Sequence, residues 1–323
     1  MVTAAREPQA NVKDQIGRVG LQHAEVVKNI ERVILGKRKV IERVLAAMAA
    51  GGHTLLLDVP GVGKTMLARS VAASIHCSFK RIQFTPDLLP LDITGANIFN
   101  LRQKAFEFVP GPVFANLLLA DEINRATPKT QAALLEVMAE GQVTVEGTTH
   151  LLPPPFLVLA TMNPLDHDGT FPLPAAQLDR FSIRVSMGYP SPDAEMRMLD
   201  VHLGKDTAIG GLEPVIHVED FLQWQALVSH VHVAESVKRY AVTVVGAMRN
   251  DSACLQAPSP RGLLMWMRMA MASAMLQGRD HCLPQDLKDV AVDVLAHRIV
   301  AAGNRSGAAY VEETVRKTPM PRA

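Results

Sequence analysis

The sequence predicts an α/β fold in which a parallel sheet with helices on both faces is followed by a smaller all-helical domain. Three observations lead to this prediction. Short apolar runs alternate with helical stretches from about residue 19 to residue 188, which is typical of a parallel sheet. A glycine-rich turn follows the first of these runs. Over residues 189–305 the alternation stops and helical periodicity takes over.

The composition is that of a globular protein, and 323 residues suit about two domains. With a net charge of +1, no global field draws the chain to nucleic acid or anionic lipid. The longest apolar stretch, residues 263–276, is too short to span a bilayer, and the polar N-terminus has no apolar signal core. We therefore expect a cytoplasmic protein without a membrane span, with free thiols at Cys77, Cys254 and Cys282.

The N-terminal part of the chain is expected to begin with a flexible tail, residues 1–18. Apolar residues then recur at helical spacing over residues 19–35 and, after an interruption at Gly36, over residues 40–50. Two helices are therefore predicted before the first strand.

Residues 55–65, Leu-Leu-Leu-Asp-Val-Pro-Gly-Val-Gly-Lys-Thr, have the order that a phosphate-binding loop needs. An apolar strand enters a glycine turn, and Lys64-Thr65 opens a helix. Gly61 and Gly63 let backbone amides approach the phosphates, Lys64 reaches the β- and γ-phosphates, and the Thr65 hydroxyl ligates Mg²⁺. A glycine-rich turn that binds nothing is the alternative, but the flanking strand and helix favour the functional interpretation.

A wall for the adenine ring is predicted ahead of this loop. Chain that precedes a phosphate-loop strand often folds back over the adenine, although packing in the core explains the same residues equally well. The candidate ATP-binding residues are then Pro60, Gly61, Val62, Gly63, Lys64, Thr65, Met66 and Asp121, with Ile34, Leu35 and Gly36 at the adenine.

Two adjacent carboxylates, Asp121 and Glu122, end the apolar run over residues 116–120. In a phosphate-loop ATPase, Asp121 would hold Mg²⁺ through its water shell, and Glu122 would orient and activate the attacking water. Alone, such a pair is more often the solvated end of a strand. Its place downstream of a phosphate loop makes the catalytic interpretation strong.

A further apolar run over residues 156–161 leads to Asn163. Its amide can hydrogen-bond the attacking water or the γ-phosphate. The Asn-Pro pair also spells a turn, and both interpretations can hold together. Strands are predicted in addition over residues 79–84 and 182–186.

Two hairpins are predicted to interrupt the alternation, one over residues 93–112 and the other over residues 142–152. The first contains β-like runs at 96–99 and 105–109, and the second turns at Glu146-Gly147. A helix over residues 130–140 lies between them in the sequence.

The all-helical domain is predicted to span residues 189–305. It begins after Tyr189-Pro190-Ser191-Pro192, and Ser259-Pro260-Arg261 marks a helix start by an N-cap and a first-turn proline. The C-terminal residues 306–323 are expected to be frayed. The predicted helices cover residues 193–203, 219–230, 235–250, 260–277 and 284–301.

Taken together, these motifs resemble the MoxR family of AAA+ ATPases from about residue 20 to residue 301. The family accepts aspartate at the position of Asp58, where the general phosphate-loop pattern has glycine. Met162 is a mild departure from the family pattern. The resemblance rests on runs in one order, at residues 58–65, 119–126, 160–164, 178–181, 188–190 and 259–261.

The resemblance implies an AAA+ nucleotide-binding domain over residues 19–188, a helical lid, and a homo-oligomeric ring, usually of six subunits, with ATP between subunits. On this basis Asn163 is the sensor of its own site, and Arg180 is an arginine finger for the neighbouring site. Arg261 is a lid arginine that senses the nucleotide. A surface charge paired with Asp179 is the alternative for Arg180, and a plain helix-end arginine is the alternative for Arg261.

The function that the resemblance implies is Mg²⁺-dependent ATP hydrolysis by a chaperone-like remodeller, which inserts a cofactor or metal or activates a partner complex. Family members often act with proteins that bear a von Willebrand factor A domain. A nucleic-acid motor or clamp-loading ATPase on the same fold is the alternative, and the near-neutral charge disfavours nucleic acid as a partner. A small-molecule kinase is disfavoured by the hairpin insertions and the finger motif.

Overall fold

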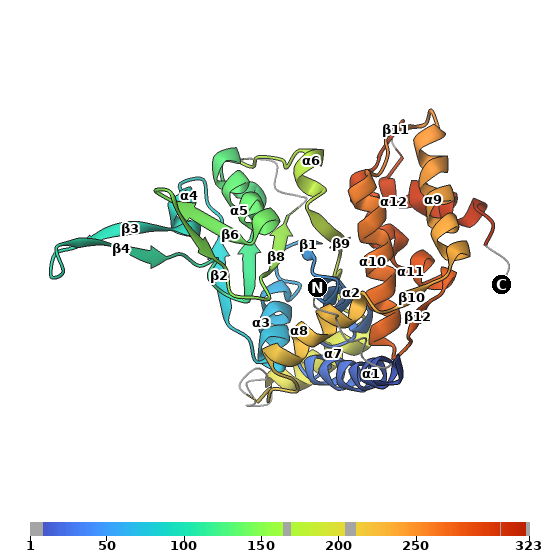
Figure 1. Cartoon of the computed structure of the whole chain (residues 1–323), viewed down its shortest axis with the longest axis horizontal. Helices are drawn as coiled ribbons and strands as arrows, with labels where there is room; N and C mark the ends of the chain where they lie inside the picture. The colour runs from blue at the N-terminus through green and yellow to red at the C-terminus, as the bar shows by residue number, and fades with distance from the viewer. Residues whose placement is uncertain (1–8, 164–168, 204–210, 304, 321–323) are drawn as a thin grey trace, which may run out of the picture.

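Five parallel strands form the central sheet of the molecule (Figure 1). The computed structural model describes residues 9–163, 169–203, 211–303 and 305–320. The strands lie in the order β2-β5-β8-β1-β9, which confirms the predicted parallel α/β core. Their bounds are His53–Leu57 for β1, Phe79–Gln83 for β2, Leu117–Asp121 for β5, Leu157–Met162 for β8 and Phe181–Val185 for β9.

The register of the strands defines two edges of this sheet. His53 lies opposite Phe181 where β1 and β9 begin, and Leu57 lies opposite Met162 where β1 and β8 end. We call the side where β1, β5 and β8 end the carboxyl edge, and the side where β1 and β9 begin the amino edge. At about 3.3 Å per residue, the five residues of β9 separate the two edges by about 16 Å.

Alternate residues of the strands face two apolar layers, as the period of two in a β-strand requires. Leu56, Leu119 and Leu159 face the layer that contains helices α1, α2 and α3, whereas Leu118 and Val158 pack with α5. Both faces are therefore covered. These helices span Gln9–Glu31 (α1), Arg38–Ala49 (α2), Lys64–Ile75 (α3) and Pro128–Glu140 (α5).

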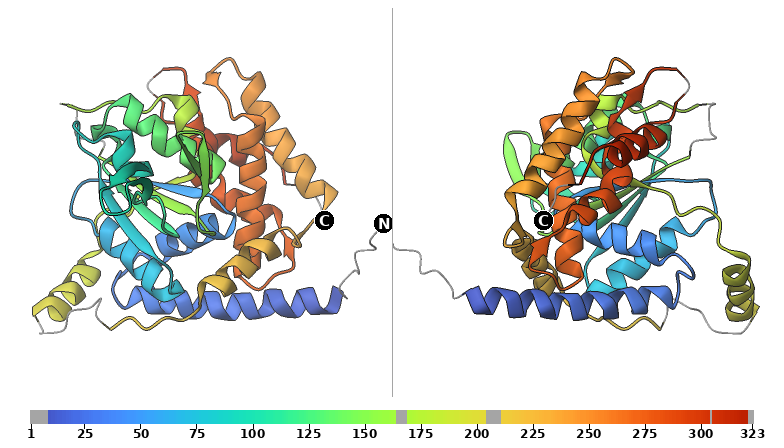
Figure 2. Two further views of the ribbon diagram at one scale, coloured as in Figure 1. Left: turned by 60° about the vertical axis from the view of Figure 1, so that its left-hand side comes forward. Right: turned by 90° about the vertical axis from the view of Figure 1, so that its right-hand side faces the viewer.

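Helix α1 begins earlier than predicted, so the expectation of a flexible tail was wrong for residues 9–18. Ile16 is fully buried and Val12 is partly buried, because both continue the apolar stripe of Val19, Val26 and Ile30 toward the N-terminus. Residues 1–8 lie outside the described part of the chain. Figure 2 shows α1 running beneath both the sheet and the C-terminal helices.

Both predicted hairpins are confirmed, and they touch one another. The turn of the second hairpin has positive φ at Glu146 (48°) and Gly147 (82°), as a two-residue hairpin turn requires. The ring of Phe108 stacks on His150 with 3.9 Å between centroids, and Asn97 donates to Glu146 at 2.8 Å. The strands are β3 (Gly95–Asn100), β4 (Ala105–Pro110), β6 (Gln142–Val145) and β7 (Thr148–Leu151), and β3–β4 projects far from the sheet (Figure 1).

The C-terminal helices pack on the core rather than apart from it. One apolar cluster runs from α1 and α2 to Trp224, Trp266 and Val290. No helix in the described ranges is both long enough and apolar enough to cross a membrane, and all three cysteines carry free thiols. The helices are α7 (Pro192–Leu203), α8 (Val218–Val228), α9 (Glu235–Asn250), α10 (Pro260–Leu276), α11 (Pro284–Leu295) and α12 (Gly307–Lys317).

Helix α12 corrects the prediction of a frayed end over residues 306–323, of which residues 321–323 lie outside the described part of the chain. Ser306 caps it by accepting from the Ala309 amide at 3.2 Å, and Tyr310, Val311 and Val315 are buried at helical spacing. The predicted helix over residues 284–301 is also shorter, because a 3-10 turn over Ala296–Arg298 follows α11. The remaining short elements are α4 (Pro90–Thr94), α6 (Ala175–Leu178), the 3-10 turn Ile123–Arg125, β10 (His232–Val233), β11 (Cys254–Gln256), β12 (His281–Cys282) and β13 (Val300–Ala301).

Candidate nucleotide site

The turn between β1 and α3 has the backbone of an anion-binding loop. Gly61 (φ 83°) and Gly63 (φ 92°) both lie in the left-handed region, where a side chain would strain the backbone. Space around the Cα of Gly61 is open, since among the described residues no atom beyond the two chain neighbours would lie within 4 Å of a Cβ placed there. The first amides of α3 therefore face an accessible site where a helix N-terminus favours negative charge.

Lys64 is the first residue of α3, and its side chain is buried. Its Nζ donates to the carbonyl oxygens of Asp58 (2.8 Å) and Val59 (3.2 Å), within the same loop. Burial lowers the pKa of Lys64, and the carboxylates of Asp58, Asp121 and Glu122 oppose that shift. The ammonium group thus lies between the phosphate loop and the acidic residues, while the neighbouring Thr65 is half-buried.

Asp58 ties the phosphate loop to the segment that follows β9. Its Oδ1 accepts from the Ser186 hydroxyl (2.7 Å) and the Gly188 amide (3.0 Å), and its Oδ2 accepts from the Met187 amide (2.5 Å). A glycine, which the general pattern has here, could make none of these bonds. Asp58 is therefore a structural tie, a role that the sequence interpretation missed.

A cleft of about 680 Å³ lies beside the phosphate loop. It contains Ile34 and Leu35, the two apolar residues predicted to contact adenine. Gly36 is not part of its lining and lies against Ala194 instead. An apolar cleft next to an anion-binding loop suits a purine nucleotide. Its lining is completed by Val33, Lys37, Pro60, Gly61, Val62, Gly63, Met66, Met187, Tyr189, Pro190, Glu195, Met198 and Leu199.

The two predicted catalytic carboxylates lie at the carboxyl edge and share one partner. The hydroxyl of Thr161, which is fully buried at the end of β8, donates to Asp121 at 2.6 Å and accepts from the Glu122 amide at 2.8 Å. Glu122 has a φ of 57°, which is uncommon for a residue other than glycine and recurs at active sites. Asn163 is buried just beyond the same strand.

Three polar partners of these carboxylates were not predicted. Arg81 on β2 forms an ion pair with Asp121, with Nη2 2.7 Å from Oδ2. Gln83, on the same strand, donates to Glu122 at 2.9 Å, and Arg125 donates to the same carboxylate at 3.0 Å. Arg81 and Gln83 come from β2, which lies next to β5 in the sheet, whereas Arg125 lies in the 3-10 turn that follows β5. Polar residues near the end of a strand were the only signal in the sequence.

Oxygen donors suited to Mg²⁺ are present at this edge. The Thr65 hydroxyl and the Asp121 carboxylate are the hard oxygen ligands that Mg²⁺ takes, usually together with waters and phosphate oxygens. The space around Gly61 is open enough for a phosphate group to approach the loop. The residues present therefore fit a magnesium–nucleotide complex.

Arg180 and Arg261 lie at the amino edge, away from the phosphate loop of their own chain. Arg180 directly precedes β9 and donates through Nη1 to the carbonyl oxygen of Leu135 in α5. Arg261 is exposed in the first turn of α10. Burial lowers the pKa of His53, at the start of β1, to about 4, and Arg261 is close enough to add to that shift.

The alternative interpretation pairs Arg180 with Asp179. The carboxylate of Asp179 accepts instead from Arg298 at 2.7 Å and from Ser259 at 3.1 Å. Arg180 is half-buried and its guanidinium bonds α5. The neighbouring Asp179 carboxylate is bonded by Arg298 and Ser259. The N-cap predicted at Ser259 is confirmed, because its hydroxyl accepts from the Gly262 amide at 3.1 Å.

Comparison with family profiles supports the two-part organisation. Residues 53–183 match the profile described as ATPase family associated with various cellular activities (AAA). Residues 247–318 match the profile described as AAA lid domain. The first profile covers the phosphate loop and the acidic pair, and the second covers Arg261 and α12.

Individual proteins match over most of the chain. The uncharacterized protein YeaC of Bacillus subtilis (strain 168) is 49% identical over 85% of this chain and 86% of its own. Chaperone MoxR1 of Mycobacterium tuberculosis is 41% identical over 84% of this chain and 74% of its own. Protein MoxR of Paracoccus denitrificans is 31% identical over 90% of this chain and 91% of its own. A crystal structure from Cytophaga hutchinsonii superposes with a TM-score of 0.90 at 35% identity, covering 97% of this chain and 99% of that one.

Proposed function

The chain belongs to the MoxR family of AAA ATPases, and we propose that it hydrolyses ATP, with Mg²⁺, at the boundary between two copies of itself. One observation carries the proposal. The phosphate loop and the carboxylates lie at the carboxyl edge, whereas Arg180 lies at the amino edge, about 16 Å away by the length of β9. A site with both parts requires a neighbouring subunit.

Each part of the site has a defined task in this reaction. The cleft at Ile34 and Leu35 would receive adenine, and the amides from Gly61 to Lys64 would hold the phosphates. Thr65 and Asp121 would hold Mg²⁺, which when bound neutralises phosphate charge. Glu122 orients and activates the attacking water, and Asn163 orients the same water or the γ-phosphate.

Arg180 would supply the remaining positive charge to the neighbour. Phosphoryl transfer spreads negative charge over the γ-phosphate oxygens, and an arginine from an adjoining subunit stabilises that charge. Arg180 cannot reach the phosphates of its own chain across the sheet. The same reasoning assigns the sensing role of Arg261 to the neighbour's nucleotide, since Arg261 lies at the same edge. A closed ring, of six subunits as is usual in the family, satisfies every site.

We further propose a chaperone-like role in which hydrolysis remodels a partner protein or complex in the cytoplasm. The name of one relative, Chaperone MoxR1, supports this role. The projecting hairpin β3–β4 offers a contact surface, with Leu101 82% and Phe106 69% exposed. A partner with a von Willebrand factor A domain fits the family pattern.

Subunit mixing tests the shared site. Arg180→Ala and Glu122→Gln should each bind ATP and hydrolyse it poorly, Arg180→Ala by a factor on the order of 10³ or more. In mixed rings, a Glu122→Gln subunit lends its Arg180 to an Arg180→Ala neighbour whose own Glu122 is intact. The ATPase rate should therefore pass through a maximum near equal proportions. A flat rate in rings shown to be mixed would rule out the shared site.

A further inference from the structure

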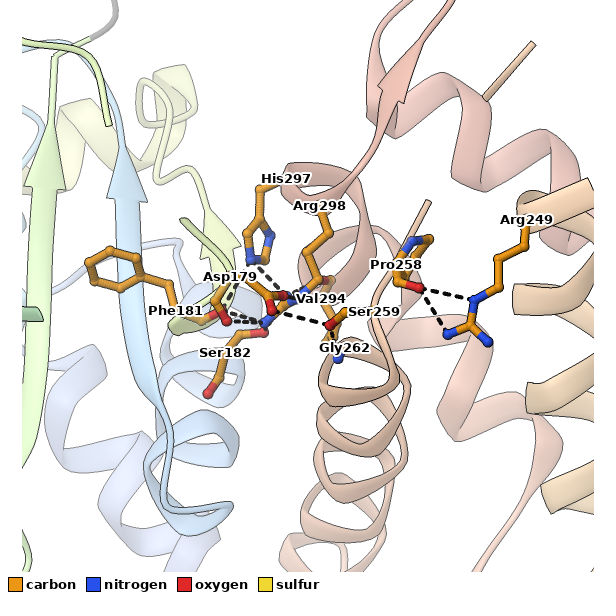
Figure 3. A network of polar contacts seen from close by, with 10 residues as sticks. All are labelled: Asp179, Phe181, Ser182, Arg249, Pro258, Ser259, Gly262, Val294, His297 and Arg298. Atoms are coloured by element: carbon orange, nitrogen blue, oxygen red, sulfur yellow. Dashed lines mark hydrogen bonds and ion pairs between the residues drawn. The ribbon is translucent and has the colours of Figure 1, made fainter. Parts of the chain in front are cut away.

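One buried arginine of the lid, Arg298, bonds residues 179, 181 and 182, which flank Arg180 in the chain (Figure 3). Arg298 follows α11 and is only 3% exposed. Its Nε donates to the Asp179 carboxylate at 2.7 Å, and its Nη2 donates to the carbonyl oxygens of Phe181 (2.6 Å) and Asp179 (3.2 Å). Its Nη1 reaches the carbonyl of Ser182 at 3.3 Å. Residues on both sides of Arg180 are thus held by a single side chain.

A second lid element converges on the same carboxylate. The hydroxyl of Ser259 donates to Asp179 at 3.1 Å while capping α10. Arg249 of α9 fixes the preceding residue by donating to the Pro258 carbonyl at 2.9 Å. Asp179 is therefore bonded to the N-cap of α10 and to the 3-10 turn that follows α11, two separate parts of the lid.

The side chain of Arg298 fits in place only because residue 262 is a glycine. A Cβ on Gly262 would lie 2.9 Å from the Cδ of Arg298, so any larger residue would displace the arginine. Burial lowers the pKa of Arg298, and the ion pair with Asp179 opposes that shift. Burying such a pair carries a large desolvation cost, so an apolar contact would join two domains with less penalty. A role in fixing the backbone around Arg180 would explain why an ion pair, Arg298–Asp179, is buried here.

We propose that Arg298 and Asp179 are positioning residues that fix Arg180 for its action on the neighbouring site, so that the lid of one subunit sets the hydrolysis rate of the next. The inference rests on the proposed role of Arg180 as the arginine finger. Arg180 itself keeps its guanidinium on α5 through Leu135. The lid thus controls the backbone of Arg180 and leaves its charge available to the neighbour.

Subunit mixing separates this role from a plain structural tie between lid and core. Arg298→Lys keeps the charge but loses the planar fork that bonds several acceptors at once. Alone, folded Arg298→Lys rings should keep the KM for ATP unchanged. Their kcat should fall on the order of 10²-fold, because a misplacement of about 1 Å at a reacting centre costs that much in rate. Mixed with Glu122→Gln they should regain activity, and mixed with Arg180→Ala they should not.

If Arg298→Lys does not fold, a pair of less disruptive variants tests the same proposal. Ser259→Ala and Ser306→Ala each remove one N-cap from a lid helix, with similar cost to folding, but only Ser259 touches Asp179. Ser259→Ala should lower kcat several-fold and be rescued by Glu122→Gln, whereas Ser306→Ala should keep the parent rate.

The possible outcomes are distinct. If Arg180→Ala with Glu122→Gln shows a maximum but the Arg298 and Ser259 variants with Glu122→Gln do not, the positioning role is overturned while the finger stands. Equal kcat for Ser259→Ala and Ser306→Ala would overturn it as well. If Arg180→Ala with Glu122→Gln is itself flat, the finger assignment fails first.

Discussion

The hydroxyl of Thr161 lies 2.6 Å from Oδ1 of Asp121 and donates a hydrogen bond to it. The hydroxyl oxygen of Thr161 also accepts from the backbone amide of Glu122. Thr161 therefore holds Asp121 by its side chain but Glu122 only by its backbone. The Glu122 side chain can change without releasing Asp121, so the two carboxylates can be separated by mutation.

Lys64→Ala should abolish nucleotide binding, because the ammonium and its phosphate contacts are lost together. Glu122→Gln should bind ATP as the parent does, since Asp121 and the loop remain, yet hydrolyse it very slowly. Titration with a fluorescent ATP analogue, together with phosphate release, measures both properties. If Glu122→Gln bound as little nucleotide as Lys64→Ala, the division of tasks between Asp121 and Glu122 would be wrong.

Asp58→Gly restores the general phosphate-loop pattern, yet it should destabilise this protein. Three hydrogen bonds to residues 186–188 disappear, and bonds to charged groups contribute enough for a loss on the order of 3 kcal/mol in the free energy of unfolding. Nucleotide binding should weaken, because Met187 lines the cleft. Urea unfolding and ATP titration check this.

Asp58→Asn serves as the control, since its amide oxygen retains one acceptor. It should fall between the parent and Asp58→Gly in both measurements. Equal stability of Asp58→Gly and the parent would contradict a structural role for this carboxylate.

The pH dependence of stability should reveal His53. Burial keeps its pKa near 4 in the folded protein, while an unfolded histidine takes up a proton below about 6.5. The stability that this difference contributes is complete above pH 6.5 and is lost as the pH falls toward 4, by on the order of 3 kcal/mol. Chemical unfolding at a series of pH values measures the slope.

His53→Gln should flatten that slope. A glutamine amide can accept from the Val158 amide and donate to the Met138 carbonyl, as the imidazole does, but it does not titrate. His23 and His297, whose pKa values are also lowered by burial, continue to titrate in the variant. Parallel curves for parent and variant would mean that His53 is not the group responsible.

The second hairpin should carry partner contact rather than catalysis. Replacing residues 145–148 by a short Gly-Ser turn should leave basal ATPase unchanged, because within the described ranges the hairpin supplies no hydrogen bond or ion pair to the carboxylates or the loop. Glu122→Gln protein, with and without the replacement, can be used as bait for cellular partners, followed by mass spectrometry. Proteins captured only by the intact hairpin are its contacts. Loss of basal turnover in a folded variant would assign the hairpin to the active site.

The features that could be predicted from the sequence are those formed by residues close together in the chain. The phosphate loop, the Asp121–Glu122 pair and both hairpins are continuous patterns, so their residue types and spacing were sufficient. Arg81 and Gln83 could not be assigned, because their role depends on β2 lying beside β5. The order of strands in a sheet follows from packing across the whole domain.

Long-range ties were missed for the same reason. Asp58 bonds residues about 130 positions later, and Arg298 bonds Asp179 across 119 positions. In the sequence, Asp58 was only a tolerated substitution, and Arg298 was one residue in a predicted helix. Helix α12 was missed because its buried face is short and follows a polar stretch.

The two hairpins have a mechanical consequence through their contact at Asn97 and Glu146. The second hairpin continues directly from α5, whose Leu135 carbonyl holds Arg180. A shift of α5 would therefore swing both hairpins as one lever. Each strand of β3–β4 spans about 20 Å, so a tilt of about 10° at the base would carry the apolar tip about 3–4 Å. Small movements of α5 at the subunit boundary would thus become larger movements at the tip of the β3–β4 hairpin.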